Sequence, residues 1–433
     1  MTTIAIAGHS NLGKTTLLRT MTKAACGVIA DSEGTTREAE PIEYPLLHAT
    51  FIDCPGFTRA SAVWPQLERS DVSIENIEPK YDAEKVALRA IASADVVIYV
   101  GSLETVPGDT HRDELHLIAK VNPRIIGLLN KRIQQSKALK RNQLSAREAA
   151  WTHALSEEGV TSVFDFDAHW DRYSRLADIY SAIASILVGE KRVIFQKRLA
   201  EFVESLNRTR VKASKLAAGT LLACRALLAT DESERENHNV SSVKARLRQQ
   251  VADEVSLYLQ QFAEESRKLY EIAVATSEHT LRLKETEFKR KSERMTAMAT
   301  HSGIATGIGT LLGLAIGAVL GGPVGAIVGA KIGAGIGAGG GLISGSVVET
   351  NTHIEVRLSP QDLRDTALFC LAILWCLTHQ GFGNDPTVLT EDFERALDFV
   401  KGEIKAIKHP EWERCSEVTM AGWFTESLQS LEV

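Results

Sequence analysis

The sequence predicts a doubly wound, mainly parallel α/β domain over residues 1–188, followed by a mainly α-helical region with a glycine-rich helical hairpin. Three observations support this fold class. Short apolar runs of strand length recur through the first part of the chain, as in sheets covered on both faces by helices. Residues 191–300 contain almost no glycine or proline and are rich in Ala, Leu, Glu, Lys and Arg. Residues 303–345 contain 16 of the 31 glycines.

The first element is a strand followed by a phosphate-binding loop. Residues 4–7 form an apolar run, and residues 8–15 read GHSNLGKT, which fits G-x-x-x-x-G-K-[ST]. Residues 16–21 then predict the first turns of a helix. Backbone N–H groups at a helix N-terminus surround phosphate, the lysine reaches the β/γ oxygens, and the hydroxyl ligates Mg²⁺. We therefore expect a P-loop NTPase site formed by Gly8, Asn11, Leu12, Gly13, Lys14, Thr15 and Thr16.

The next elements supply the other parts of a phosphate site. Residues 50–57 predict a strand that ends in D-C-P-G. Asp53 is placed to hold Mg²⁺ through water, and the Gly56 N–H is placed to sense a γ-phosphate. Between the two motifs, residues 34–37 form a polar loop with a hydroxyl available to the metal. Further apolar runs predict strands, and the run over 125–131 ends in Asn-Lys.

These motifs resemble those of the Era/TrmE-like GTPases of the translation-factor class. The resemblance rests on GHSNLGKTT, GTTR and DCPG, and it covers residues 1–188. It implies a domain that hydrolyses GTP, with Lys14, Thr15 and Asp53 around the phosphates and Mg²⁺. It also implies that Thr36, with Thr35 as the alternative, is the switch threonine, a catalytic group and magnesium ligand.

The guanine-binding motif departs from the family pattern. The family's N-K-x-D becomes Asn130-Lys131-Arg132-Ile133, so Asn130 and Lys131 are expected at the base but the carboxylate is missing. The Ser-Ala-Lys loop is also absent. In its approximate place, residues 163–170 predict a strand and an acidic loop that offers Asp165 or Asp167 as a replacement. The other interpretation is an ordinary acidic loop, so guanine specificity is open.

The catalytic part of the site also departs from the family pattern. Phe57 follows D-x-P-G where many GTPases carry a glutamine that orients water. Relatives with an asparagine at the position of Asn11 and an apolar residue at that of Phe57 use a monovalent cation. The resemblance therefore implies potassium assistance through Asn11. The alternative is that Asn11 only shapes the loop.

Composition limits the classes of partner. The net charge of -6 and the pI near 6.1 give no global basic field, which argues against DNA and RNA. The six cysteines lack C-x-x-C spacing and are expected to be reduced, buried side chains. The first strand starts next to Met1 and leaves no room for a signal peptide, so we expect a cytoplasmic protein.

The glycine-rich segment repeats with a period of four. Glycines occur at every fourth position from 309 to 345, and Lys331 is the only charge in residues 303–345. Gly321-Gly322-Pro323 divides the segment into two legs close to the length of a membrane span. Small residues at this spacing allow close helix contacts in a bilayer. We expect a glycine-zipper hairpin at the inner membrane, with burial within the protein or an oligomer as the alternative.

The remaining residues complete four expected regions. Residues 189–300 are helical, 301–347 form the hairpin, and 348–433 form a helical C-terminal region in which residues 363–377 are a buried helix. Residues 231–237 are expected to form an exposed turn between two long helices. This organisation resembles bacterial proteins whose C-terminal half is classed as a domain of unknown function, DUF3482.

The sequence therefore favours a membrane-associated GTPase that couples its nucleotide state to the glycine zipper, with a membrane or membrane-protein partner and homo-oligomerisation as further expectations. Two rivals stay open. One is a soluble Era-like factor for RNA or ribosome assembly. The other is a low-turnover nucleotide-binding subunit of a membrane complex.

Overall fold

The computed structural model describes residues 1–22, 39–68, 73–168, 171–231, 240–274, 346–349, 353–379 and 390–431. It divides into two compact units, one built mainly from Met1–Ser205 and the other mainly from Leu206 onward. The division lies within the long helix α8 (Gly189–Ala226). The switch loop at 34–37 and the glycine segment at 303–345 lie outside the described residues.

The first unit is an α/β domain whose sheet has the order β2-β3-β1-β4-β5-β6. β2 runs antiparallel to β3, and every other neighbouring pair is parallel. Besides three short 3₁₀ turns, the unit contains, in chain order, β1 (Thr2–Ala7), α1 (Lys14–Thr22), β2 (Glu40–Tyr44), β3 (Ala49–Asp53), α2 (Ala60–Glu68), α3 (Asp82–Ser93), β4 (Val96–Ser102), α4 (Asp109–Val121), β5 (Ile125–Asn130), α5 (Arg132–Ala138), α6 (Arg141–Glu157), β6 (Val163–Asp165) and α7 (Tyr173–Ile186).

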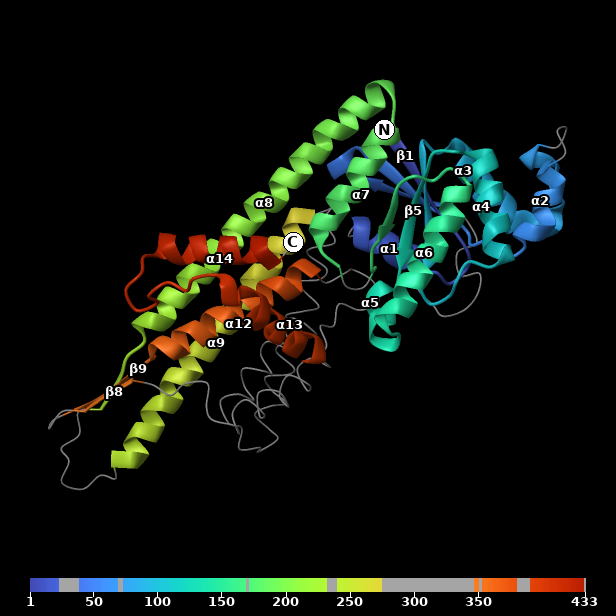
Figure 1. Cartoon of the computed structure of the whole chain (residues 1–433). Coiled ribbons are helices and arrows are strands. Elements are labelled where there is room, and N and C mark those ends of the chain that lie inside the picture. Colours follow the sequence, from blue (N-terminus) through green and yellow to red (C-terminus); the bar gives the residue numbers. More distant parts are fainter. Residues whose placement is uncertain are drawn as a thin grey trace. The chain divides into compact units, whose positions relative to one another are not determined.

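Helices cover both faces of this sheet, with α1 and α7 on one side and α3, α4 and α6 on the other (Figure 1). Alternate residues of each strand point to opposite faces. Both faces are therefore apolar: Ala5 and Val97 belong to the core with α3 and α4, while Ile4 and Ile6 are also fully buried. This explains the continuous apolar runs in the sequence. The arrangement aligns the carboxyl ends of β1, β3, β4 and β5 at one edge of the sheet.

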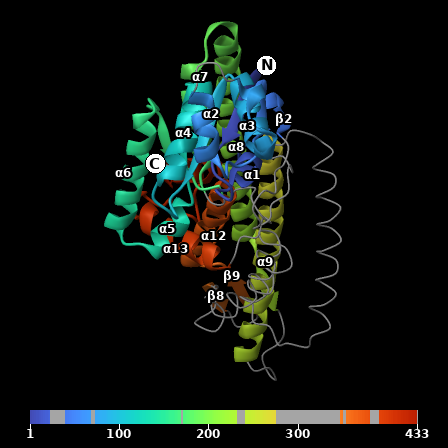
Figure 2. The same ribbon diagram turned by 90° about the vertical axis from the view of Figure 1, so that its right-hand side faces the viewer.

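The second unit is mainly helical. Along with the C-terminal part of α8, it contains β7 (Ala229–Asp231), α9 (Val240–Val274), β8 (Ser346–Glu349), β9 (Ile354–Arg357), α12 (Pro360–His379), α13 (Thr390–Glu403) and α14 (Glu417–Leu431). Helix α12 packs against α13 (Figure 2) and α14, and it is buried along nearly its whole length. The prediction of a buried helix over residues 363–377 is therefore confirmed.

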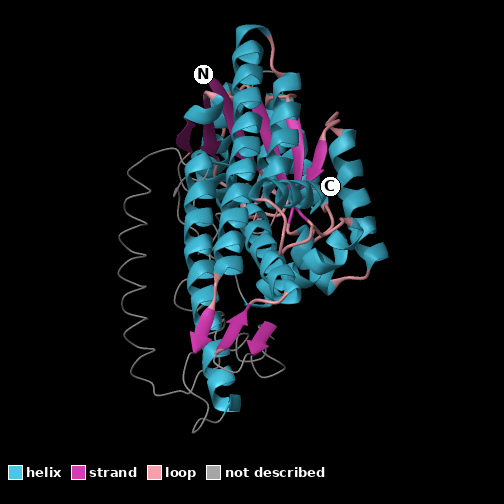
Figure 3. Cartoon of the chain, turned by 90° about the vertical axis from the view of Figure 1, so that its left-hand side faces the viewer, coloured by secondary structure: helices cyan, strands magenta, loops and turns pink. Residues whose placement is uncertain are grey.

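Two sets of strands were not predicted. One is the edge strand β2, and the other is a small antiparallel sheet in the order β7-β9-β8 (Figure 3). Asp231, expected in an exposed turn, is the last residue of β7 and pairs with Ile354. The other residues of that expected turn, 232–237, lie outside the described residues. Strands of three or four residues, such as β7, β8 and β9, are too short to show a period.

Other expectations can be compared within the described ranges. The cysteines there are free thiols, as predicted: Cys54, Cys224, Cys370 and Cys376 are buried and Cys415 is partly buried. Among the described helices, none is both long enough and apolar enough to cross a membrane.

Candidate phosphate-binding site

The P-loop connects β1 to α1 at the carboxyl edge of the sheet. Its backbone is left-handed at Gly8 (φ 140°), Asn11 (φ 62°) and Gly13 (φ 83°). A Cβ on Gly8 would lie 2.5 Å from the Val100 carbonyl oxygen of the adjacent strand β4. Glycine is therefore required at this position by both conformation and space. The loop delivers the chain to the start of α1, where the Leu17 N–H donates to the Gly13 carbonyl at 2.8 Å.

Lys14 is the first residue of α1 and bends back over the loop. Its ammonium donates to the His9 carbonyl oxygen at 2.6 Å. Burial lowers the pKa of Lys14, and the negative charges of Asp53 and Glu114 oppose that shift. Lys14 is thus a buried cation at the P-loop. Its positive charge would attract an anionic ligand there.

Thr15 and Asp53 meet beside Lys14. The Thr15 hydroxyl donates to Asp53 Oδ2 at 2.6 Å. Asp53 ends β3, which pairs in parallel with β1 so that Asp53 lies opposite Ile6. The pairing of the two strands brings a hydroxyl and a carboxylate together from positions 38 residues apart. These hard oxygen ligands are the kind that Mg²⁺ prefers.

The segment after β3 passes directly against the P-loop. A Cβ on Gly56 would lie 2.6 Å from Ser10 Oγ, 2.7 Å from its Cα and 2.8 Å from its backbone nitrogen. Phe57 is fully buried and forms a parallel bridge with His9. The Phe57 N–H donates to the Gly8 carbonyl at 3.3 Å. Gly56 therefore occupies a place that no residue with a side chain could take without moving the loop.

The P-loop also rests on a buried polar group that the sequence did not indicate. His9 Nδ1 pairs with Glu114 Oε1 of α4, and the Tyr99 hydroxyl donates to Glu114 Oε2 at 3.3 Å. Burial raises the pKa of Glu114, although its contact with His9 opposes the shift. His9 and Glu114 are 105 residues apart, so no local pattern reveals their contact.

Asn130 connects the P-loop to the other side of the site. Its side-chain amide donates to the Leu12 carbonyl at 2.9 Å, and its carbonyl oxygen accepts from the Ala168 N–H at 3.0 Å. A Cβ on Gly13 would lie 2.7 Å from Asn130 Nδ2. Lys131 follows in a left-handed conformation and pairs with Glu104 at 2.5 Å. Asn130 thus joins three loops at the edge of the sheet.

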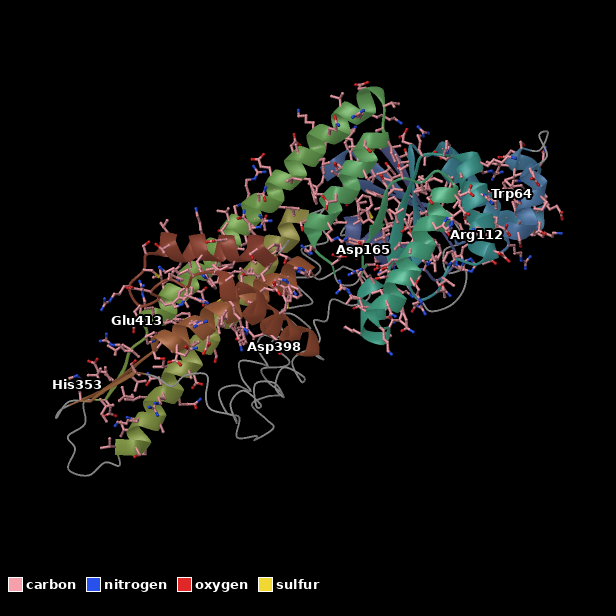
Figure 4. All side chains as sticks on the ribbon, in the orientation of Figure 1. Trp64, Arg112, Asp165, His353, Asp398 and Glu413 are labelled. Carbon is pink, nitrogen blue, oxygen red and sulfur yellow. The ribbon has the colours of Figure 1, made fainter. Side chains whose placement is uncertain are left out.

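The two acidic candidates differ in their surroundings. Asp165 (Figure 4) pairs with Arg175 at 2.7 Å and with Arg132 at 2.9 Å. Asp167 is 5% exposed, and its Oδ2 accepts from the Ile133 backbone N–H at 3.1 Å. Asp167 therefore brings a carboxylate to the backbone of Ile133, the position where the motif lacks its acidic residue. Asp165 is committed to two arginines.

The structure thus brings together most of the site residues expected from the sequence. At the carboxyl edge of the sheet and the start of α1 lie Gly8, Asn11, Leu12, Gly13, Lys14, Thr15, Thr16, Asp53, Gly56, Asn130 and Lys131. Thr35 and Thr36 lie outside the described residues. Sequence analysis missed Glu114 and also Glu84, a buried residue of α3 that binds the segment after Gly56.

Two families match the chain. Residues 3–131 match the 50S ribosome-binding GTPase family, and residues 152–378 match the domain of unknown function DUF3482. The second match begins within α6, so β6 and α7, which complete the sheet domain, fall inside it.

Similar proteins include GTPase Der from two Nitrosomonas species. The Nitrosomonas eutropha protein is 38% identical over 79 residues, which is 17% of each chain. The Nitrosomonas europaea protein is 35% identical over 99 residues, 22% of this chain and 19% of that protein. The chain therefore spans less than a fifth of the length of these relatives.

Solved structures similar to this one include Era from Aquifex aeolicus bound to GDP and aluminium fluoride. It is 15% identical, with a TM-score of 0.31, covering 59% of this chain and 89% of that chain. Elongation factor SelB from Methanococcus maripaludis is 18% identical, with a TM-score of 0.26, covering 39% and 30%. On its two matched domains, the chain belongs to the DUF3482 family and carries a P-loop GTPase domain at its N-terminus.

Proposed function

We propose that the N-terminal domain binds GTP with Mg²⁺ and hydrolyses it. The observation that carries the proposal is the meeting of Lys14, Thr15 and Asp53 at the end of the P-loop, with the Thr15 hydroxyl 2.6 Å from Asp53. A cation, a hydroxyl and a carboxylate in this arrangement form the phosphate and metal part of a P-loop nucleotide site. The match of residues 3–131 to a GTPase family supports the same activity.

The residues present fit a magnesium ion. Thr15 and Asp53 would hold it, as a hydroxyl ligand and as a carboxylate acting directly or through water. When bound, Mg²⁺ neutralises charge on the β- and γ-phosphate oxygens. Thr36 is proposed as a further ligand because the resemblance implies it.

The chain's own groups do the rest by position and charge. Lys14 would turn from the His9 carbonyl to the β/γ oxygens, and the P-loop N–H groups would surround the β-phosphate. The Gly56 N–H would face the γ-phosphate. Phe57 is fully buried and apolar, so it does not orient the attacking water.

Potassium assistance is the second part of the proposal. Asn11 has a left-handed backbone conformation within the P-loop and is exposed to solvent. Its amide oxygen is a hard ligand suited to a monovalent cation. A cation beside the phosphates would supply the positive charge that other GTPases obtain from an arginine.

Guanine recognition is proposed to use Asp167 in place of the missing carboxylate of N-K-x-D. Asp167 supports this role better than Asp165 because its Oδ2 accepts from the Ile133 backbone N–H at 3.1 Å, whereas Asp165 is paired with Arg175 and Arg132. A carboxylate accepts several hydrogen bonds. Asp167 can therefore hold Ile133 and still accept from the N1 and N2 donors of guanine.

The glycine segment is proposed to attach the protein to a membrane and to respond to the nucleotide. Its support is the four-residue glycine period in 303–345 and the near absence of charge there. GTP would order the switch loop and bias the helical region that carries the segment. The partner is then a lipid bilayer or a membrane protein, and the zipper also allows homo-oligomers.

Lys14→Ala should reduce GTP hydrolysis by at least about a hundredfold, because it removes the P-loop ammonium that would contact the β/γ oxygens. Steady-state phosphate release from the full-length chain measures this. Lys137→Ala, which removes an exposed lysine of α5, is the matched control and should hydrolyse GTP like the parent. Equal turnover by Lys14→Ala and the parent would refute the assignment.

Asp167→Asn should lower the preference for GTP over ATP by about tenfold, since a neutral amide loses a charge-assisted hydrogen bond to guanine. Displacement of a bound fluorescent GDP analogue by GTP and by ATP measures this preference. Asp165→Asn should leave it unchanged. The proposal fails if Asp167→Asn keeps the parent's preference.

Hydrolysis should be faster in potassium than in sodium at equal ionic strength, and Asn11→Ala should remove the difference. Initial rates in the two chloride salts provide the measurement. A parent rate that does not depend on the cation would exclude potassium assistance.

The full-length protein should sediment with vesicles of phosphatidylethanolamine and phosphatidylglycerol, more so with a non-hydrolysable GTP analogue than with GDP. A chain lacking 303–345 should stay in the supernatant, since it has lost the proposed anchor. Sedimentation that is unchanged by the deletion argues against the anchor, and equal sedimentation with both nucleotides argues against coupling.

A further inference from the structure

The first residue after Gly56, Phe57, is held by backbone hydrogen bonds to the P-loop. The Phe57 N–H donates to the Gly8 carbonyl at 3.3 Å, and the Ser10 N–H donates to the Phe57 carbonyl at 3.4 Å. These two bonds set the backbone at Phe57 but leave the next residues, Thr58 and Arg59, without a partner in the loop. Their hydrogen bonds are made elsewhere.

One carboxylate oxygen of Glu84 accepts the hydrogen bonds of Thr58 and Arg59. Glu84 Oε1 accepts from the Thr58 hydroxyl at 3.0 Å, the Thr58 backbone N–H at 3.3 Å and the Arg59 backbone N–H at 3.0 Å. Arg59 immediately precedes α2, and its carbonyl accepts from the Ala62 N–H at 3.0 Å. Glu84 therefore binds the N-terminus of α2, where a negative charge is favourable.

The helix that carries Glu84 is firmly packed. Glu84 is 3% exposed and lies in the first turn of α3. Leu88 and Ile91 of the same helix are fully buried in the core. At the end of the helix, the Asn122 side chain donates to the carbonyls of Ile91 at 3.0 Å and Ala94 at 2.8 Å. The acceptor thus belongs to a rigid element, as a positioning group requires.

We propose that Glu84 is a positioning residue of the nucleotide site, which holds the Gly56 N–H where it meets a γ-phosphate. Gly56 lies between Asp53, at the end of β3, and the residues that Glu84 binds. With both sides fixed, the peptide keeps one orientation before the nucleotide arrives. The inference rests on the proposed binding and hydrolysis of GTP.

Loss of Glu84 should weaken the binding of GTP and not that of GDP, because only GTP carries the γ-phosphate that Gly56 would meet. Glu84→Ala removes the acceptor of three partly buried hydrogen bonds, so the backbone N–H groups of Thr58 and Arg59 lose this partner. We expect its affinity for a non-hydrolysable GTP analogue to fall by about tenfold. Its affinity for GDP should stay within about twofold of the parent, since the hydrogen bonds of Glu84 go to Thr58 and Arg59, outside the P-loop that would surround the β-phosphate. GTP turnover should fall with the analogue affinity.

Calorimetric titration of the full-length variants with the GTP analogue and with GDP tests the inference. Glu84→Gln retains Oε1 as an acceptor and should recover most of the parent's preference for the analogue. Thr58→Val removes only the hydroxyl donor and should shift the preference in the same direction by a smaller factor, which keeps the test available if Glu84→Ala does not fold. Glu75→Ala removes an exposed carboxylate that pairs with Arg89 of α3 and should change neither affinity.

Equal losses for GDP and the analogue in Glu84→Ala would overturn the inference and leave Glu84 a purely structural residue. Unchanged analogue affinity in both Glu84→Ala and Thr58→Val would overturn it as well. Failure of the parent itself to bind either nucleotide would instead refute the proposed function.

Discussion

The site depends on the close approach of two backbone segments, the P-loop and the residues after β3. Gly56 lies so near Ser10 that a Cβ would come within 2.8 Å of three of its atoms, and Gly8 is similarly close to the Val100 carbonyl. Such distances exclude any side chain unless the backbone moves. Because the two segments touch without side chains between them, Lys14, Thr15 and Asp53 reach one small region. The parallel pairing of β1 with β3 fixes this geometry from the core of the sheet.

Around this contact, buried polar side chains hold the loops from outside the motifs. Glu114 holds His9 from α4, Glu84 holds the start of α2 from α3, and Asn130 holds Leu12 from the end of β5. Each of these side chains is almost fully buried, so the loss of a partner would leave an uncompensated polar group. The P-loop and the segment after β3 are therefore held in place by the helices and strands behind them.

Sequence analysis found the parts of the site that depend on local order. The P-loop glycines, Lys14 and Thr15 follow a strand in a short motif, and Asp53 and Asn130 each end a strand. The structure has these strands within a few residues of the prediction. Glu84 and Glu114 could not be found this way, because each contacts a segment 25 to 105 residues away. Asp167 is proposed as the guanine-binding carboxylate in preference to Asp165 because Asp165 pairs with Arg132 and Arg175. The spacing of residues in the sequence does not predict these two contacts. The small β7-β9-β8 sheet joins strands more than 100 residues apart along the chain.

The central claim is that this edge of the sheet is a guanine nucleotide site, and direct titration tests it best. Calorimetry of the full-length chain with GTP and with ATP, each in excess Mg²⁺, measures stoichiometry and preference together. The account predicts one GTP site per chain and weaker binding of ATP. Absence of nucleotide binding, or ATP bound as tightly as GTP, would contradict it.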